Sequence, residues 1–163
     1  MESTERGTPL LGDVKVHVRL KLSALWAAVM FCYVYGDIFG FFKPGTVKDI
    51  VAGKTGFLGT QSGLLAAAAL MAVPSVMVFL SLALPPRTCR YVNIVLGLLY
   101  TAVIVATMPG AWEFYIFLGI VEAALTLTIV AYAWRWPKAD GKRAGAAAPA
   151  LSSRPQEPAA PRV

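Results

Sequence analysis

Residues 111–134 read AWEFYIFLGIVEAALTLTIVAYAW. The only charged residues in this run are Glu113, near its start, and Glu122, near its middle. A helix of roughly 20 mostly apolar residues spans a hydrocarbon core about 30 Å thick. The stretch therefore predicts a membrane-spanning helix that carries a carboxyl group at mid-membrane.

Three more apolar runs of similar length precede it, at residues 22–42, 62–84 and 91–109. Hydrophobic residues make up 57% of the chain, charged residues only 15%, and the mean hydropathy is +0.62, which is far from the composition of a soluble domain. We therefore expect an all-α protein, a bundle of four transmembrane helices. Its membrane domain would cover residues 22–136 with one substantial loop at 43–61. The polar segments 1–21 and 137–163 are expected to be tails, with residues 1–13 and 137–163 disordered.

The distribution of positive charge predicts the orientation of these spans. Twelve of the 15 lysines and arginines lie in the two terminal segments and in the turn between the second and third runs, and the other three lie in the loop 43–61. Because cytoplasmic segments carry the excess of Lys and Arg, both termini are predicted to be cytoplasmic. The net charge of +6 is then an orientation signal, and no nucleic-acid partner is expected.

Glu122 is the strongest candidate for a functional residue. It lies about 16 Å along its helix from the start of the run, so its side chain cannot reach an interface. A carboxyl group at that depth has to be buried in protein and either protonated or paired. Candidate partners are Tyr100 and the backbone carbonyl of Leu70, which Pro74 leaves without its usual amide donor. A structural hydrogen bond and a proton-coupled binding site both remain open.

Asp37 is a second intramembrane acid, in the outer third of the first run, with Tyr33 one turn earlier on the same face. It could hydrogen-bond Tyr33 or pair with Lys43 or Lys54. It could equally form a cation or proton site that opens outward. The candidate intramembrane polar site is therefore Asp37, Glu122, Tyr33 and Tyr100.

Small residues recur every four positions along the first run. They place a stripe of small side chains on one helix face, with a GxxxG pair at its outer end, and predict close helix packing at Ala28, Cys32, Gly36 and Gly40. A partner helix within the chain is favoured over a second copy, and a homo-oligomer stays open. In the third run, Asn93, Gly97 and Thr101 predict hydrogen bonding and close packing between helices.

Other local patterns predict boundaries. In the loop, Thr46 and Asp49 have capping-box spacing and Gly53 can end the short helix that they predict. Aromatic residues at the ends of the runs predict interfacial belts, with Trp26, Trp134 and Trp136 at the inner interface and Trp112 and Tyr115 at the outer one.

No catalytic set is visible in the sequence. The chain has one histidine, two cysteines outside any CxxC pair, no nucleophile motif, no metal-ligand cluster and no phosphate-binding loop. We therefore expect no catalytic residue, no cofactor and no metal, and we expect the protein not to be an enzyme.

Three motifs occur in order: Tyr-x-Asp at 35–37, Arg-x-x-Asn-Ile at 90–94 and Trp-x-Trp at 134–136. With them, residues 20–137 resemble a family of small bacterial four-span membrane proteins without an assigned activity. The resemblance implies a multi-pass protein of the bacterial plasma membrane and supplies no catalytic residue.

The expected function is that of a small integral membrane protein in packing, assembly or small-solute handling, without enzymatic chemistry. One alternative is a proton-coupled small-solute transporter that uses Glu122 and Asp37. A further alternative is a membrane enzyme acting on a lipid or quinone. The lipid bilayer is the predicted partner, and the sequence does not specify a solute.

Overall fold

The fold is known from a computed structural model that describes residues 16–136. Its helices are α1 (Val18–Phe41), α2 (Thr46–Val51), the 3-10 helix η1 (Gly56–Gly59), α3 (Gln61–Ala83), α4 (Pro86–Thr107) and α5 (Glu113–Trp134). Four of them, α1, α3, α4 and α5, are long and apolar enough to cross a membrane. The all-α class and the four spans of a multi-pass membrane protein are thus as predicted. Most of the two expected tails lies outside the described residues.

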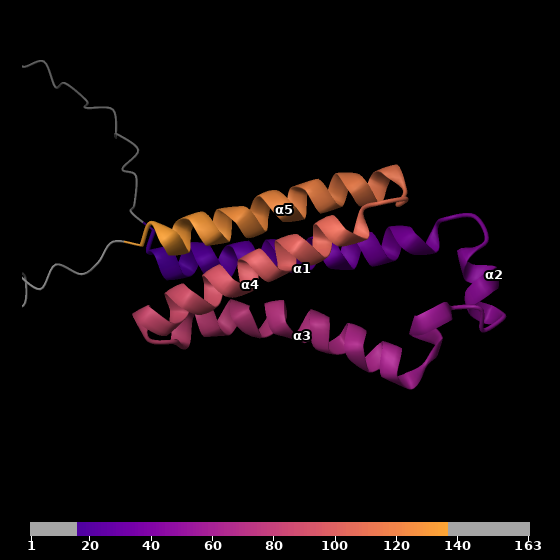
Figure 1. Ribbon diagram of the computed structural model, residues 1–163, viewed down its shortest axis with the longest axis horizontal. Helices are drawn as coiled ribbons and strands as arrows, with labels where there is room; N and C mark the ends of the chain where they lie inside the picture. The colour runs from indigo at the N-terminus through magenta and orange to yellow at the C-terminus, as the bar shows by residue number, and fades with distance from the viewer. Residues whose placement is uncertain (1–15, 137–163) are drawn as a thin grey trace, which may run out of the picture.

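The four long helices run up and down beside one another (Figure 1). We call the end at which α1 begins and α5 ends the terminal end, and the end that carries α2 the loop end. Helix α1 packs against α3 and α5, and α4 packs against α5. Helices α3 and α4 are joined by a short turn but share few contacts, and α3 diverges from α1 toward the loop end. The bundle is therefore tighter at its terminal end.

Two spans begin earlier than their apolar runs. Helix α1 starts at Val18 because the imidazole Nδ1 of His17 caps it, accepting a hydrogen bond of 3.3 Å from the backbone N–H of Arg19. Helix α4 starts at Pro86, since a proline at the first helical position has no N–H group to leave unsatisfied.

The loop contains the predicted short helix, α2, but the expected capping box does not form. Gly45 occupies the N-cap with a left-handed φ of 87°, and no side chain caps the helix. Gly53, at φ 68°, follows its last turn as predicted, since glycine adopts this conformation without steric cost.

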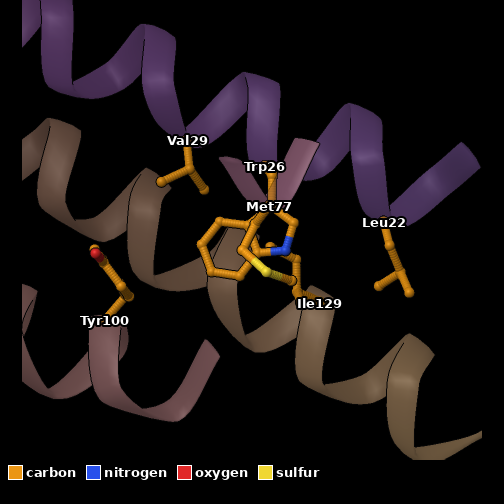
Figure 2. Close-up of a cluster of buried hydrophobic side chains, with 6 residues drawn as sticks. All are labelled: Leu22, Trp26, Val29, Met77, Tyr100 and Ile129. Carbon is orange, nitrogen blue, oxygen red and sulfur yellow. The ribbon is translucent and has the colours of Figure 1, made fainter. Parts of the chain in front are cut away.

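The hydrophobic core lies mainly in the terminal half of the bundle, and Figure 2 shows its buried side chains. All four spanning helices contribute to it, and its fully buried members are Leu22, Trp26, Val29, Met77, Tyr100 and Ile129. Trp26 is completely buried, so the prediction that it belongs to an interfacial belt is wrong. Trp112 and Trp134, by contrast, expose 54% and 66% of their surface, as belt residues should.

Trp26 is buried because it has a polar partner inside the bundle. Its indole N–H donates a 2.8 Å hydrogen bond to Oδ1 of Asn93, which is itself fully buried. The amide of Asn93 donates in turn to the carbonyl of Cys89 at 2.8 Å. Farther along α4, the hydroxyls of Thr101 and Thr126 lie 2.7 Å apart. The predicted hydrogen bonding between helices along this face of α4 is therefore confirmed.

Close helix packing occurs at different glycines from those in the small-residue stripe. A methyl group added at Gly97 would lie 2.7 Å from Val130 and 3.2 Å from the backbone oxygen of Thr126, and one added at Gly119 would lie 2.7 Å from Met108. At Gly36 the nearest atom would be 3.8 Å away, an ordinary contact with Leu118, and at Gly40 nothing lies within 4 Å. Between spanning helices, these close glycine contacts thus lie where α4 meets α5, as expected for Gly97, whereas a methyl group at Gly40 would meet no neighbouring atom.

Candidate functional site

One small cavity lies toward the loop end of the bundle. It has a volume of about 110 Å³ and lies next to the core, and all four spanning helices line it. Its lining residues are Cys32, Tyr33, Gly36 and Asp37 of α1, Leu70 and Met71 of α3, Val103, Ile104 and Thr107 of α4, and Tyr115, Leu118, Gly119 and Glu122 of α5. Both intramembrane acids named from the sequence therefore line one cavity.

Glu122 is held at the inner part of this cavity by α5. The residue exposes only 6% of its surface, and within residues 16–136 its carboxyl group makes no hydrogen bond. Its backbone carbonyl accepts a bond of 3.0 Å from Thr126, but this bond leaves the side chain untouched. Burial without a partner is costly for a carboxylate, so the group depends on what the cavity supplies, whether water, a proton or a cation.

The two partners proposed for Glu122 bind each other instead. The hydroxyl of Tyr100 donates a 2.6 Å hydrogen bond to the backbone carbonyl of Leu70. That carbonyl is the one that Pro74 leaves without an amide donor inside α3. The carbonyl of Leu70 therefore has the side-chain donor that the sequence predicted, but the donor is Tyr100 and not Glu122.

Asp37 lies at the exposed edge of the same cavity. Its side chain is exposed, whereas Glu122 is buried, so the two acids mark an outer and an inner position of the cavity. None of the lining residues is a lysine, arginine or histidine. Lys43 and Lys54, the two lysines that the sequence offered as partners of Asp37, therefore do not line the cavity.

Tyr33 connects the cavity to the core. Its hydroxyl is buried and has no hydrogen-bond partner among the described residues, so the predicted bond to Asp37 is not formed. Its ring packs edge-on against Tyr100 with centroids 6.5 Å apart, and Tyr100 packs in the same way against Trp26 at 5.8 Å. Tyr33 thus belongs both to the wall of the cavity and to the aromatic packing of the core.

Sequence reasoning missed several lining residues. Tyr115, assigned to an interfacial belt, also donates a 3.1 Å hydrogen bond to Thr107 across the α4–α5 turn. Cys32 and Gly36, assigned to helix packing, face the cavity. The sequence did contain a signal for this position. Cys32 and Gly36 lie one turn apart and directly precede Tyr33 and Asp37, so all four residues are expected on neighbouring parts of one helix face.

The polar groups of this site are suited to binding and proton transfer. Two carboxyl groups and an unpaired phenol can hold a proton or a small cation. Among residues 16–136, no group of three or more His, Cys, Asp or Glu side chains could hold a metal ion.

Comparison with known proteins places the chain in a family but not in a functional class. No curated protein and no solved structure matches it. Residues 13–142 match a family described as a family of unknown function, DUF6326. This match covers all four spanning helices and the whole cavity. The protein belongs to the family of unknown function DUF6326.

Proposed function

We propose that this membrane protein binds a small solute in the cavity between Asp37 and Glu122 and couples its binding to a proton at Glu122. The observation that carries the proposal is the Glu122 carboxyl group, which is 6% exposed, makes no hydrogen bond within residues 16–136 and lines a cavity. An intramembrane acid without a structural partner serves best as a site that gains and loses a proton or cation.

The shape of the bundle supports access from one side. The core closes the terminal half, where Leu22, Trp26 and Val29 of α1 are completely buried. The cavity occupies the loop half, and Asp37 at its edge is exposed. A solute would therefore enter near Asp37 and stop at Glu122. Transport would require a second state in which the terminal half opens.

The cavity limits the solute to a small molecule. An apolar cavity of about 150 Å³ accepts benzene, so 110 Å³ suits a compact solute of only a few non-hydrogen atoms. With two acids and no basic residue in the wall, a cation is favoured over an anion. Ammonium, methylammonium and guanidinium ions meet both conditions.

We propose further that both termini are cytoplasmic and that the protein resides in a bacterial plasma membrane. The support for the orientation is the distribution of Lys and Arg, 12 of which lie in the segments assigned to the cytoplasm. In this orientation Asp37 faces outward. A reporter fused after Val163 should be active only in the cytoplasm, and a cysteine at position 54 should be labelled from outside intact cells. External labelling of the C-terminal tail would reverse the orientation.

The proposed role involves no enzymatic chemistry and no nucleic-acid partner. The support is the sequence, which holds a single histidine and no nucleophile motif. Roles in packing or assembly remain the alternative in which Glu122 only occupies space.

The experiment is a measurement of pH inside proteoliposomes while candidate solutes are added outside. Guanidinium salts and neutral glycerol form the panel, because ammonia and methylamine cross a bilayer unaided and raise the internal pH without any protein, and Glu122→Gln is compared with the wild type. Glutamine keeps the size of the side chain but cannot change charge, so it should fold normally and abolish solute-driven proton movement. Glu113→Gln is the matched control, since Glu113 lies in the first turn of the same helix but outside the cavity wall.

Two results would count against the proposal. Proton movement of wild-type size in Glu122→Gln would remove Glu122 from the coupling. No movement in the wild type with any solute of the panel would favour the packing or assembly role.

A further inference from the structure

A second concave surface lies at the other end of α5. Its lining residues are Leu127, Thr128, Ala131, Tyr132 and Arg135. They recur at intervals of three and four, so they form one face of the helix. We call this surface the α5 groove. It shares no residue with the cavity between Asp37 and Glu122, and nothing in the proposed function involves it.

The α5 groove changes from apolar to charged along its length. Leu127, half exposed, lies at its deeper end, and Arg135 follows the last residue of the helix at the terminal end. The distance between them along the axis is about 12 Å. The only hydroxyl at the deeper end, that of Thr128, already donates a 2.7 Å bond to the carbonyl of Ala124. The deeper end is therefore apolar in practice, and the charge lies where the helix leaves the membrane.

A second cation stands beside the first. The ammonium group of Lys21, on α1, lies 5.4 Å from the centroid of the Tyr132 ring. Lys21 of α1 thus lies next to Tyr132, and Arg135 follows Tyr132 one turn later on the same face of α5. Two cations contributed by neighbouring helices at one groove suit a phosphate diester at the membrane surface.

Other arginines at this end are already engaged within the protein. Arg19 donates a 3.0 Å bond to the carbonyl of Leu82, and Arg90 donates a 3.0 Å bond to the carbonyl of Trp134. Within residues 16–136 the charged groups of Lys21 and Arg135 make no such bond between helices. They remain available for an external anion.

We propose that the α5 groove binds one anionic phospholipid, with its phosphate between Lys21 and Arg135 and an acyl chain along Ala131 and Leu127. The order of chemistry along the groove, charged at the membrane boundary and apolar below it, matches that of a phospholipid in either leaflet. A second copy of the chain fits less well. The described acids, Asp37, Asp49, Glu113 and Glu122, all lie at the loop end or at mid-membrane, so a parallel copy would place cations against cations.

Native mass spectrometry of the full chain, titrated with phosphatidylglycerol, tests the headgroup. The double variant Lys21→Gln/Arg135→Gln should bind about thirtyfold more weakly than the wild type, since each cation near a membrane surface contributes about a factor of five. The control is Arg87→Gln/Lys54→Gln, which removes two cations outside the groove and should stay within about twofold of the wild type. Equal weakening in both double variants would overturn the site, because it would show that only net charge matters.

A second variant tests the acyl contact without any change of charge. Ala131→Trp fills the groove with a side chain that lipid-exposed surfaces tolerate, and it should also weaken phosphatidylglycerol binding severalfold. Phosphatidylcholine, which has the same chains and a phosphate offset by its choline cation, should lose less affinity in Lys21→Gln/Arg135→Gln than phosphatidylglycerol does. Unchanged phosphatidylglycerol binding in Ala131→Trp, or a change from dimer to monomer in that variant, would overturn the proposal, and the dimer would identify the groove as an interface between copies.

Discussion

The hydroxyl of Tyr100 binds the backbone carbonyl of Leu70 at 2.6 Å and thereby joins α4 to α3. These two helices share few other contacts, so this bond holds them together at the level where the core ends and the cavity begins. It also uses the one carbonyl that Pro74 frees. Because Tyr100 satisfies it, Glu122 keeps an unpaired carboxyl group for the cavity.

Removing this hydroxyl should destabilise the bundle. Tyr100→Phe leaves the Leu70 carbonyl without a donor, and hydrogen bonds between membrane helices contribute about 0.6 kcal/mol on average and up to about 1.7 kcal/mol. We expect a loss of about 1 kcal/mol in the free energy of unfolding, measured by denaturation in detergent. Tyr91→Phe, on the exposed surface of α4, should be silent. In Pro74→Ala, which restores the amide donor, Tyr100→Phe should cost less, and equal costs in both backgrounds would contradict the pairing.

Alanine substitutions should separate the glycine that packs closely from those that do not. At Gly97 the new methyl group would lie 3.2 Å from the backbone oxygen of Thr126 and 2.7 Å from Val130, and such overpacking costs about 1–3 kcal/mol. Gly36→Ala and Gly40→Ala should change the stability by less than about 0.5 kcal/mol, because the space is open there. The measurement is thermal unfolding in detergent for the three variants. A larger loss of stability in Gly36→Ala than in Gly97→Ala would show that the closest helix packing involves the small-residue stripe of α1.

Replacing tryptophans should distinguish the core from the interface. Trp26→Phe removes the N–H group that donates to Asn93 and leaves a buried amide oxygen poorly satisfied, which costs about 1–3 kcal/mol. Trp134→Phe, at an exposed position, should cost less than about 0.5 kcal/mol. Unfolding free energies of the two variants provide the comparison. Equal losses of unfolding free energy in the two variants would contradict the core position of Trp26.

The two cysteines should report whether the cavity is open to water. Cys32 lines the cavity and is half-buried, whereas Cys89 is fully buried and its thiol lies 3.3 Å from the carbonyl of Ser81. A small polar thiol reagent should therefore label Cys32 to completion before Cys89 reacts, since Cys89 becomes accessible only through local opening. Mass spectrometry of the single variants Cys32→Ala and Cys89→Ala measures the two rates. Faster labelling of Cys89 would mean that the cavity is closed.

The site could be predicted only in part, for reasons that particular residues make clear. Glu122 and Asp37 stand out in the sequence because an acid in an apolar run is costly wherever it faces. The use of the Leu70 carbonyl was also predictable, because Pro74 removes its donor locally. The group that donates a hydrogen bond to that carbonyl could not be predicted, because Glu122 and Tyr100 were both candidates. The choice depends on the distances from α3 to α4 and to α5.

By itself, the sequence determined that this protein has four apolar helices, where each one roughly lies and which acids they carry. These properties follow from the free energy of moving single side chains and peptide groups out of water, which depends on local composition. Only the tertiary structure decided that Trp26 lies in the core, that the predicted close packing is absent at Gly40, and that Asp37 and Glu122 line one cavity. These outcomes depend on the distances between helices that are far apart in the chain, and side-chain packing throughout the bundle sets those distances.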